Sequence, residues 1–447
     1  MLFPLILESK LIKMKKIYFV SLLFLASCQY ALNEKATVHV EDVDRFWQAY
    51  DLIVAEADSI AQLELIQTMY IDKGTRGLKA LIDKRNYTAE AYVNAINHFP
   101  KFWNSVRANT MKCVHFADDI EANIDKLKKV YPDLKPASVY FTIGAMRTGG
   151  QAHRGHVLIG SEFALSDSTV VCSELEPARL KENLCSYFHG NPIDDVVLLN
   201  VHEYVHTQQG DYGYDLVSMC IFEGVAEFVS CLAAEKASAS PAIGYGEKHA
   251  DRVKERFQKE MFSPHWNDWL YNDFENEFGV RDLGYYVGYA ICESYYELAK
   301  DKPLAIKEMI ELDCSDEGEV EEFVSASQYF SEDYASLKKT YLDAKPQVEG
   351  ILEFDNESSV VDPSTSSISI RFSTVMNDRF KNFKLGPKGR KKLIPYQSVQ
   401  WSDDRMVLHL KVELESNKRY QLLVDSEFRD LEGRTVDPYL IDFKTSF

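Results

Sequence analysis

The spacing of apolar residues changes along the chain and divides it into parts. Between residues 43 and 135, apolar side chains recur at steps of three and four positions, as at Phe46, Ala49 and Ile53. That is the period of an amphipathic helix. We therefore predict a helical lead-in over residues 38–135, and its many aromatic residues should give it a substantial core.

A short β region follows the helical lead-in. Residues 138–144 and 156–160 are apolar runs rich in β-branched and aromatic residues, and a glycine pair lies between them at 149–150. This arrangement predicts two strands that pair with each other, with a turn at the glycines, within residues 138–165.

Helical patterns return after the strands. Asn191 followed by Pro192 is a plausible N-cap and first helical residue, so a helix should begin there. We expect two helices within residues 192–237, and further helices over residues 284–345. The last part, residues 350–447, instead has short alternating runs separated by turn residues, which predicts a β-sandwich.

Length and charge agree with this division. A chain of 447 residues is long enough for two or three domains. Its formal net charge of -19 argues against binding nucleic acid or an anionic membrane through a basic face. Residues 350–447 hold 15 acidic and 15 basic residues, so the whole acidic excess lies upstream of them. The charge shift supports a domain boundary near residue 350.

The first residues have the features of a processing signal. Within residues 14–28, a basic start precedes an apolar stretch, and Leu25-Ala26-Ser27-Cys28 matches the bacterial lipobox. This resemblance to lipoprotein signals implies cleavage before Cys28 and attachment of lipid to its thiol. The expected location is the cell envelope, on its periplasmic or surface face. Gln29 favours the outer membrane over inner-membrane retention.

The remaining cysteines do not form an obvious framework. Without Cys28 they number seven, and no close CxxC pair occurs among them, which argues against a thiolate zinc site. Cys172 and Cys185 flank a predicted loop and could pair in an oxidising compartment. The cysteines in apolar helical runs are expected to be small buried residues.

One segment carries the pattern of a metal site. In His202-Glu203-Tyr204-Val205-His206, the two histidines lie four residues apart and so share one helix face. Glu203 follows the first histidine, where a carboxylate can act as general base. A catalytic zinc ion needs a third protein ligand and leaves a fourth position open. The next predicted helix offers two candidates, Glu223 and Glu227.

The segment Glu223-Gly224-Val225-Ala226 resembles the ligand motif of the gluzincins, the thermolysin and aminopeptidase type of zinc peptidase. Phe222 stands where that motif often has asparagine. The resemblance implies a zincin-like fold, Zn²⁺ held by His202, His206 and Glu223, and Glu227 supporting a ligand histidine. The two glutamates share a helix face, so an exchange of their roles stays open. No histidine stands six residues beyond His206, which excludes the extended metzincin motif.

Two broader resemblances set the domain limits. The predicted domain 38–346 resembles, over about residues 40–345, predicted bacterial zinc-dependent proteases, a group defined mostly by sequence. Residues 350–447 resemble bacterial immunoglobulin-like domains. The matching residues are Ile143-Gly144, Gly149-Gly150, Thr207-Gln208-Gln209 and Glu223 to Glu227 in the first part, and Asp362-Pro363, Phe372-Ser373, Met376, Trp401, Tyr420, Asp430, Gly433, Pro438-Tyr439 and Phe443-Lys444-Thr445 in the second. The predicted fold class is thus α+β, a mainly helical zincin-like domain with a small sheet followed by an Ig-like β-sandwich.

The predicted function is that of a zinc-dependent peptidase with Glu203 as general base and a peptide or protein as substrate. Tyr285 and Tyr289 are candidates for stabilising the transition-state charge, because gluzincins often use tyrosine there. Arg147 stands where a similar aminopeptidase motif has the glutamate that binds a free amine, so endopeptidase activity is favoured. The alternative is a catalytically inactive zincin-fold lipoprotein that binds a protein or glycan.

Overall fold

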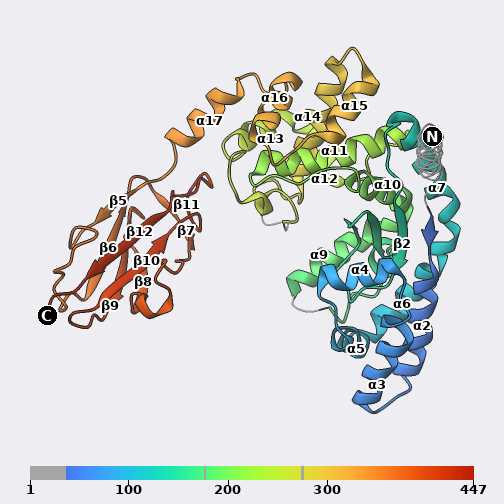
Figure 1. Cartoon of the computed structure of the whole chain (residues 1–447), viewed down its shortest axis with the longest axis horizontal. Helices are drawn as coiled ribbons and strands as arrows, with labels where there is room; N and C mark the ends of the chain where they lie inside the picture. Colours follow the sequence, from blue (N-terminus) through green and yellow to red (C-terminus); the bar gives the residue numbers. More distant parts are fainter. Residues whose placement is uncertain (1–36, 176–177, 273–275) are drawn as a thin grey trace, which may run out of the picture. The chain divides into compact units, whose positions relative to one another are not determined.

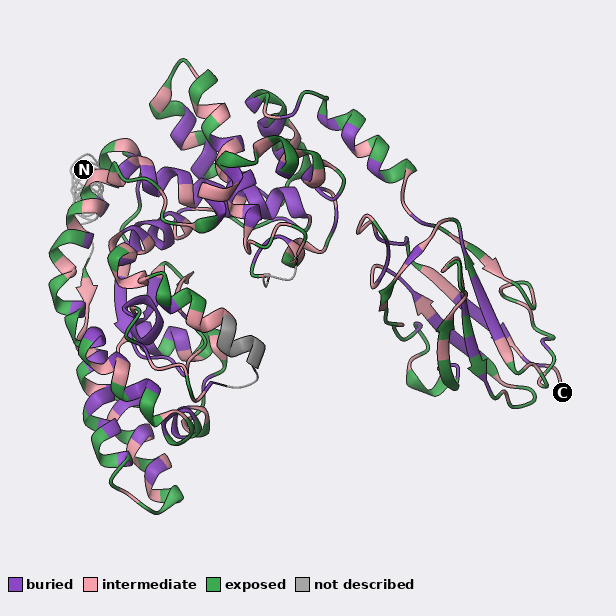
Figure 2. Cartoon of the chain, turned by 180° about the vertical axis from the view of Figure 1, so that it is seen from behind, coloured by how far each residue is buried: buried purple, intermediate pink, exposed green. Residues whose placement is uncertain are grey.

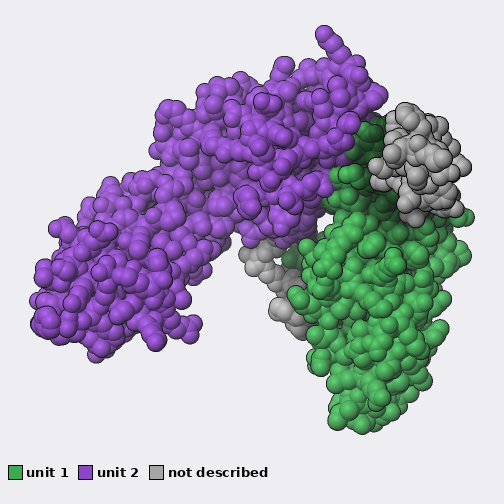
Figure 3. Space-filling model, in the orientation of Figure 1, with its two compact units in different colours: residues 1–208 green, residues 209–447 purple. Residues whose placement is uncertain are grey.

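In the computed structural model of the chain, residues 37–175, 178–272 and 276–447 are described (Figure 1). The predicted signal at 14–28, including Cys28, lies outside them. The protein is α+β, with helices up to Asp343 and antiparallel strands from Val348 onward, as the hydrophobic pattern predicts. Two compact units are distinguished, residues 1–208 and 209–447 (Figure 3).

The first unit begins with the predicted helical lead-in. Three of its helices start at side-chain caps, in which Asp58, Thr75 and Thr88 accept hydrogen bonds from backbone N–H groups. Aromatic rings fill the space between the helices, and the ring centroids of Phe46 and Trp103 lie 5.1 Å apart. The helices are α2 (Glu41–Ile53), α3 (Ser59–Ile66), α4 (Arg76–Arg85), α5 (Ala89–His98), α6 (Pro100–Thr110) and α7 (Ala117–Val130).

A four-stranded sheet follows, in the order β1-β2-β4-β3. Its strands are β1 (Val38–His39), β2 (Ser138–Thr142), β3 (Gly150–His153) and β4 (His156–Gly160). The two predicted strands, β2 and β4, do pair, but in parallel, with Val139 opposite Val157. The turn predicted at the glycine pair is wrong, because Gly150 begins β3, which runs antiparallel to β4 at the sheet edge. A loop, rather than a tight turn, therefore separates β2 from β3.

The loop after β2 is held in place by a buried carboxylate. Glu162, in the short helix α8 (Ser161–Ala164), is fully buried and accepts hydrogen bonds from the N–H groups of Gly144 (3.0 Å) and Met146 (3.2 Å). Met146 takes a left-handed conformation with φ of 60°. Burial raises the pKa of Glu162 to about 7, although the two N–H groups oppose the shift.

The helix predicted to start at Asn191 begins differently. Asn191 makes no side-chain cap, and Pro192–Asp195 form a 3-10 turn. Its side-chain oxygen instead accepts a hydrogen bond from the backbone N–H of Ser168 at 3.0 Å. The α-helix itself, α10, spans Val196–His206, after the helix α9 (Ala178–His189). Upstream, a disulfide joins Cys172 to Cys185, the pair that the sequence singled out.

In the second unit, helices α11, α12, α13, α15 and α16 all contact α14. Asp215 caps α11 by accepting a hydrogen bond from the N–H of Ser218 at 3.0 Å. Among the described residues, α11 is the helix that is long and apolar enough to cross a membrane, yet 83% of its most apolar window is buried inside the protein. The helices are α11 (Leu216–Ala234), α12 (Pro241–Lys248), α13 (Ala250–Gln258), α14 (Leu283–Leu298), α15 (Lys302–Glu311), α16 (Glu317–Ser327) and α17 (Tyr334–Asp343).

Helices α11 and α14 cross without room for side chains. A Cβ atom added to Gly224 would lie 2.1 Å from the carbonyl carbon of Gly288, and one added to Gly288 would lie 1.7 Å from the carbonyl oxygen of Cys220. Glycine is needed at both positions because only hydrogen atoms fit between the two backbones.

The strands of the second unit surround one apolar core. They form the antiparallel sheet β5-β6-β9-β8 and the pairs β10–β12 and β7–β11. In β6, Ile368, Ile370 and Phe372 are buried and Arg371 is exposed, but Ser369 is buried too, so the alternation that the sequence shows holds only in part. Buried and exposed stretches follow one another along the strands of this part of the chain (Figure 2). The strands are β5 (Val348–Ile351), β6 (Ser367–Phe372), β7 (Met376–Lys381), β8 (Tyr396–Trp401), β9 (Val407–Val412), β10 (Arg419–Val424), β11 (Phe428–Asp430) and β12 (Tyr439–Lys444).

Candidate metal centre

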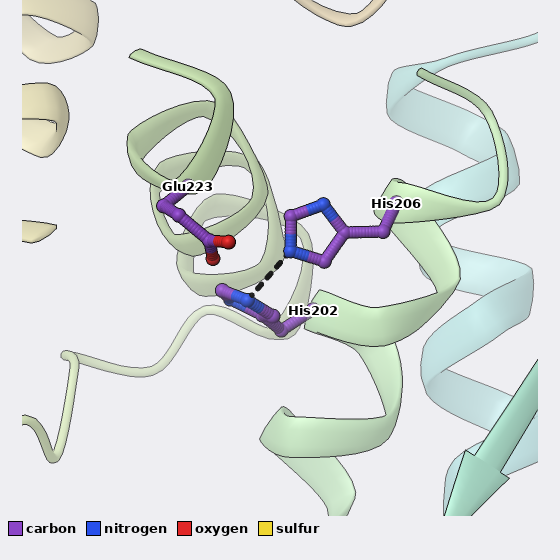
Figure 4. A group of neighbouring side chains, drawn as sticks. All are labelled: His202, His206 and Glu223. Carbon is purple, nitrogen blue, oxygen red and sulfur yellow. Dashed lines mark hydrogen bonds between the residues drawn. The ribbon is translucent and has the colours of Figure 1, made fainter. Parts of the chain in front are cut away.

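Helix α10 brings the two histidines of the motif together. His202 and His206 lie one turn apart, and their Nε2 atoms are 3.1 Å from each other (Figure 4). Val201 and Val205 on the same helix are fully buried, and α10 contacts α7, β3 and β4. This packing fixes the helix and, with it, the direction of the two imidazoles.

Glu223 of α11 completes a group of three possible ligands. One nitrogen from each histidine and one oxygen of Glu223 all lie within 4.8 Å of one another. His202 and Glu223 are buried, with 7% and 4% of their surface exposed. In the part of the chain that the structure describes, this is the group of His, Cys, Asp and Glu side chains that could hold a metal ion, and Glu227 is not a member.

The donor set fits a transition-metal ion such as zinc. Two imidazole nitrogens and a carboxylate oxygen are the ligands of many catalytic zinc sites, at about 2.0–2.2 Å from the ion. Two ligand atoms at that distance in a tetrahedral site are about 3.3 Å apart. The 3.1 Å between the histidine nitrogens is close to this separation.

Glu203 lies beside the edge strand rather than among the ligands. Its side chain is 7% exposed. A Cβ atom on Gly150, the first residue of β3, would lie 2.9 Å from its Oε1 atom. The absence of a side chain at Gly150 therefore leaves the room that the Glu203 carboxylate occupies.

Two tyrosines adjoin the third ligand. The hydroxyl of Tyr271 donates a hydrogen bond to Oε1 of Glu223 at 2.7 Å, and the hydroxyl of Tyr285 lies 3.4 Å from that of Tyr271. Exclusion of water, followed by the charge of Glu223, raises the pKa of Tyr285 well above its ordinary value. Tyr285 is thus a neutral donor near the ligand group.

Tyr289 and Glu227 lie further along their helices. The ring of Tyr289 packs against Phe228, with centroids 5.4 Å apart. Glu227 accepts hydrogen bonds from the Ser238 hydroxyl and from the thiol of Cys231, the latter at 3.9 Å. The predicted support of a histidine by Glu227, and the predicted catalytic role of Tyr289, stay predictions.

Sequence reasoning missed Tyr271 and Glu162. Tyr271 belongs to the loop before α14 and has a φ of 57°, so no helical or strand period marks it. Glu162 stands in an apolar run, where a single acidic residue gave no sign of its two backbone partners. The one available signal was that Glu162 is a single acidic residue within an apolar run of the sequence.

Arg147, which replaces the expected glutamate of the aminopeptidase motif, is engaged locally. Its guanidinium lies 4.6 Å from the ring centroid of Tyr87 and donates a hydrogen bond to the carbonyl of Arg85 at 3.2 Å. Position 147 therefore offers a guanidinium group where the aminopeptidase motif has a carboxylate.

No protein-family model matches the sequence, and no curated protein matches it significantly. The solved structures that it is similar to include S-layer proteins. They include the N-terminal part of the bacterial S-layer protein SbsC (13% identity, TM-score 0.19, covering 91% of this chain and 77% of that one). The S-layer protein rSbsC(31-844) is 12% identical with a TM-score of 0.19, and the chain covers 45% of its length. The structure of domains 1–6 of SbsC is 13% identical with a TM-score of 0.19, and the chain covers 45% of its length.

Proposed function

We propose that the protein is a zinc-dependent peptidase of the gluzincin type. The observation that carries this proposal is the group formed by His202, His206 and Glu223, whose ligand atoms lie within 4.8 Å of one another. Glu203 lies on α10 with the two histidines. Zinc binding alone does not require Glu203, so its retention beside the ligands supports catalysis.

In this proposal His202, His206 and Glu223 hold the ion. When bound, zinc supplies a Lewis acid that polarises a carbonyl and acidifies a water molecule. Glu203 removes the proton from the attacking water and later delivers it to the leaving amine. Tyr285, whose hydroxyl lies 3.4 Å from that of Tyr271 beside Glu223, can donate a hydrogen bond to the developing negative charge.

The substrate is proposed to be an extended peptide bound along β3. This strand lies at the sheet edge and pairs with β4, so its other side can form main-chain hydrogen bonds with an added strand. Gly150 would bring that peptide next to Glu203. Because Arg147 offers no carboxylate for a free amine, the favoured activity is that of an endopeptidase.

The setting of the enzyme is proposed from the sequence. The lipobox ending at Cys28 supports an exported, lipid-anchored protein of the bacterial envelope. The paired Cys172 and Cys185 agree with an oxidising compartment. Residues 350–447, with their antiparallel sheets and single core, are proposed to be an Ig-like domain that acts as a spacer or recognition module.

Metal analysis and peptide hydrolysis test the proposal together. The purified wild type should contain one zinc ion per chain, and His206→Ala should lose it. Glu203→Gln should keep the zinc and the fold but lower peptide hydrolysis by at least about a thousandfold.

The exposed Glu322 of α16 provides a matched control, since Glu322→Gln should change neither zinc content nor hydrolysis. A wild type without zinc, or a Glu203→Gln variant as active as the wild type, would overturn the proposal. Stoichiometric zinc without hydrolysis of any peptide would favour the inactive binding lipoprotein instead.

A further inference from the structure

A cavity of about 520 Å³ lies where the last turns of α11 and α14 meet. One wall is aromatic. The ring of Phe228 contacts those of Tyr289 and Tyr296, each with a centroid distance of 5.4 Å. Aromatic faces carry negative partial charge and attract cations.

Negatively charged groups around the cavity also attract cations. The carboxylates of Glu235, Glu293 and Glu297 line it. It also lies at the C-terminal ends of α11 and α14, where helix dipoles place negative partial charge. Partial burial raises the pKa of Glu293, and the nearby charges of Glu297 and Glu247 raise it further. The carboxylates of Glu293 and Glu297 therefore repel each other.

The chain's own lysines show what these walls accept. Lys236 and Lys302 also line the cavity. The ammonium group of Lys302 lies 4.5 Å from the ring centroid of Tyr296 and donates to the carbonyl of Glu297 at 3.0 Å, and to that of Tyr296. The aromatic wall and the helix end thus already hold one ammonium group, beside three carboxylates.

The cavity continues the helix faces that carry the metal centre. On α11, Glu223, Glu227 and Cys231 follow one another at four-residue steps, and Cys231 lines the cavity. On α14, Tyr285 and Tyr289 are related in the same way, and Tyr289 lines it too. Eight helical residues, from Glu223 to Cys231, span about 12 Å.

From these observations we infer that the cavity is a specificity subsite for a positively charged side chain, lysine or arginine, of a peptide substrate. An extended peptide advances about 3.3 Å per residue, and a basic side chain reaches several ångströms more. The basic residue should therefore stand two to four positions from the bond that is cut. This inference rests on the proposed peptidase function, which it extends to substrate choice.

Binding to the full-length Glu203→Gln variant tests the subsite without cleavage. The probes are acetylated and amidated heptapeptides of alanine and leucine that carry one arginine, or glutamine in its place, and the readout is isothermal titration calorimetry. The arginine peptide should bind at least tenfold more tightly, and the ratio should fall as salt is added. Adding Glu293→Gln and Glu297→Gln should reduce the ratio to twofold or less.

Adding Glu322→Gln instead should leave the ratio unchanged, and circular dichroism should show the same fold in every variant. Equal affinity for both peptides, or a ratio that survives loss of Glu293 and Glu297, would overturn the subsite. Because the binding assay needs no hydrolysis, a protein that prefers the arginine peptide but never cuts it would refute the peptidase and retain the cationic site. In an active enzyme, cleavage two to four residues from arginine is the supporting result.

Discussion

Two glycines flank functional side chains of the candidate centre, and they do so in different ways. Gly150 of β3 leaves room for the end of a flexible side chain, the carboxylate of Glu203. Gly224 of α11, next to the candidate ligand Glu223, leaves room for a backbone, that of Gly288 in α14. A carboxylate can move away from an added methyl group, but a packed helix cannot.

The difference shows how each side chain is positioned. Glu223 is fixed by helix packing, so a change beside it should act on stability. The Glu203 carboxylate lies against the neighbouring strand β3, so a change there should act on chemistry before it acts on stability. Four substitutions test this contrast.

Gly224→Ala should have the largest effect. Its methyl group would lie 2.1 Å from the carbonyl carbon of Gly288 and 2.5 Å from the backbone nitrogen of Tyr289, so the helices must separate. We expect the free energy of unfolding, measured by urea denaturation, to fall by about 3 kcal/mol.

Gly244 of α12 is the matched control. A Cβ atom there meets nothing within 4 Å, so Gly244→Ala should leave stability unchanged or raise it by up to about 1 kcal/mol. If Gly224→Ala were as stable as the wild type, the contrast between the two glycines would fail.

Glu162 should make stability depend on pH. Its pKa is about 7 in the folded protein against an ordinary value of 4.5, so the folded state keeps the proton at higher pH than the unfolded state does. Its stabilising contribution is complete below pH 4.5 and is lost as pH rises towards 7, a change on the order of 3 kcal/mol.

Urea denaturation of wild type and Glu162→Gln at pH 5, 6, 7 and 8 would measure this loss. The free energy of unfolding of Glu162→Gln should not show the part of the decline with rising pH that comes from Glu162. Burial also raises the pKa of Glu260 to about 7, but Glu260 is present in both proteins and cancels in the difference. Parallel pH profiles for the two proteins would contradict the prediction.

Gly150→Ala should lower kcat/KM for peptide hydrolysis by about tenfold, because a methyl group 2.9 Å from Oε1 of Glu203 displaces the carboxylate that we propose as general base. Zinc content should not change, and stability should stay within about 1 kcal/mol, because only a side-chain end must move.

Gly210→Ala is its control, since a Cβ atom there meets nothing within 4 Å. A Gly150→Ala variant that lost zinc or unfolded, yet whose remaining folded molecules kept full activity, would reverse the roles given to the strand and the helix.

Tyr271→Phe should have the smallest effect. It removes the 2.7 Å hydrogen bond to Glu223, worth about 1 kcal/mol, so zinc affinity should weaken about fivefold in competition with a chelator. Tyr214→Phe, at a side chain 84% exposed, should not alter it. Unchanged affinity in Tyr271→Phe would show that Glu223 is positioned by helix packing alone.

Local patterns in the sequence predicted part of this structure and long-range contacts decided the rest. The four-residue spacing of His202 and His206 was enough to place both on one helix face. The choice of Glu223 needed a resemblance, because Glu223 and Glu227 have the same periodicity and differ only in what lies opposite them. The sequence of α11 alone does not tell which of the two glutamates faces α14.

The errors have physical causes too. A glycine pair usually marks a turn, but the loop before Gly150 is held by Glu162, so the chain enters a strand where a turn was expected. Asn191 is a common capping residue, yet its side chain is already bonded to Ser168. In each case a partner distant in sequence overrides the local preference.

The apolar character of α11 has a consequence for how damage to this protein would look in a cell. The helix that carries Glu223 has a mean hydropathy of 1.8 over its most apolar window, so by length and composition it resembles a membrane-spanning segment. A variant that loosens α11 from α14 would expose a segment that aggregates or inserts into lipid. Such a variant would be recovered with the membrane fraction even when Cys28, the proposed site of lipid attachment, is replaced, so sedimentation alone would mistake misfolding for the proposed anchoring.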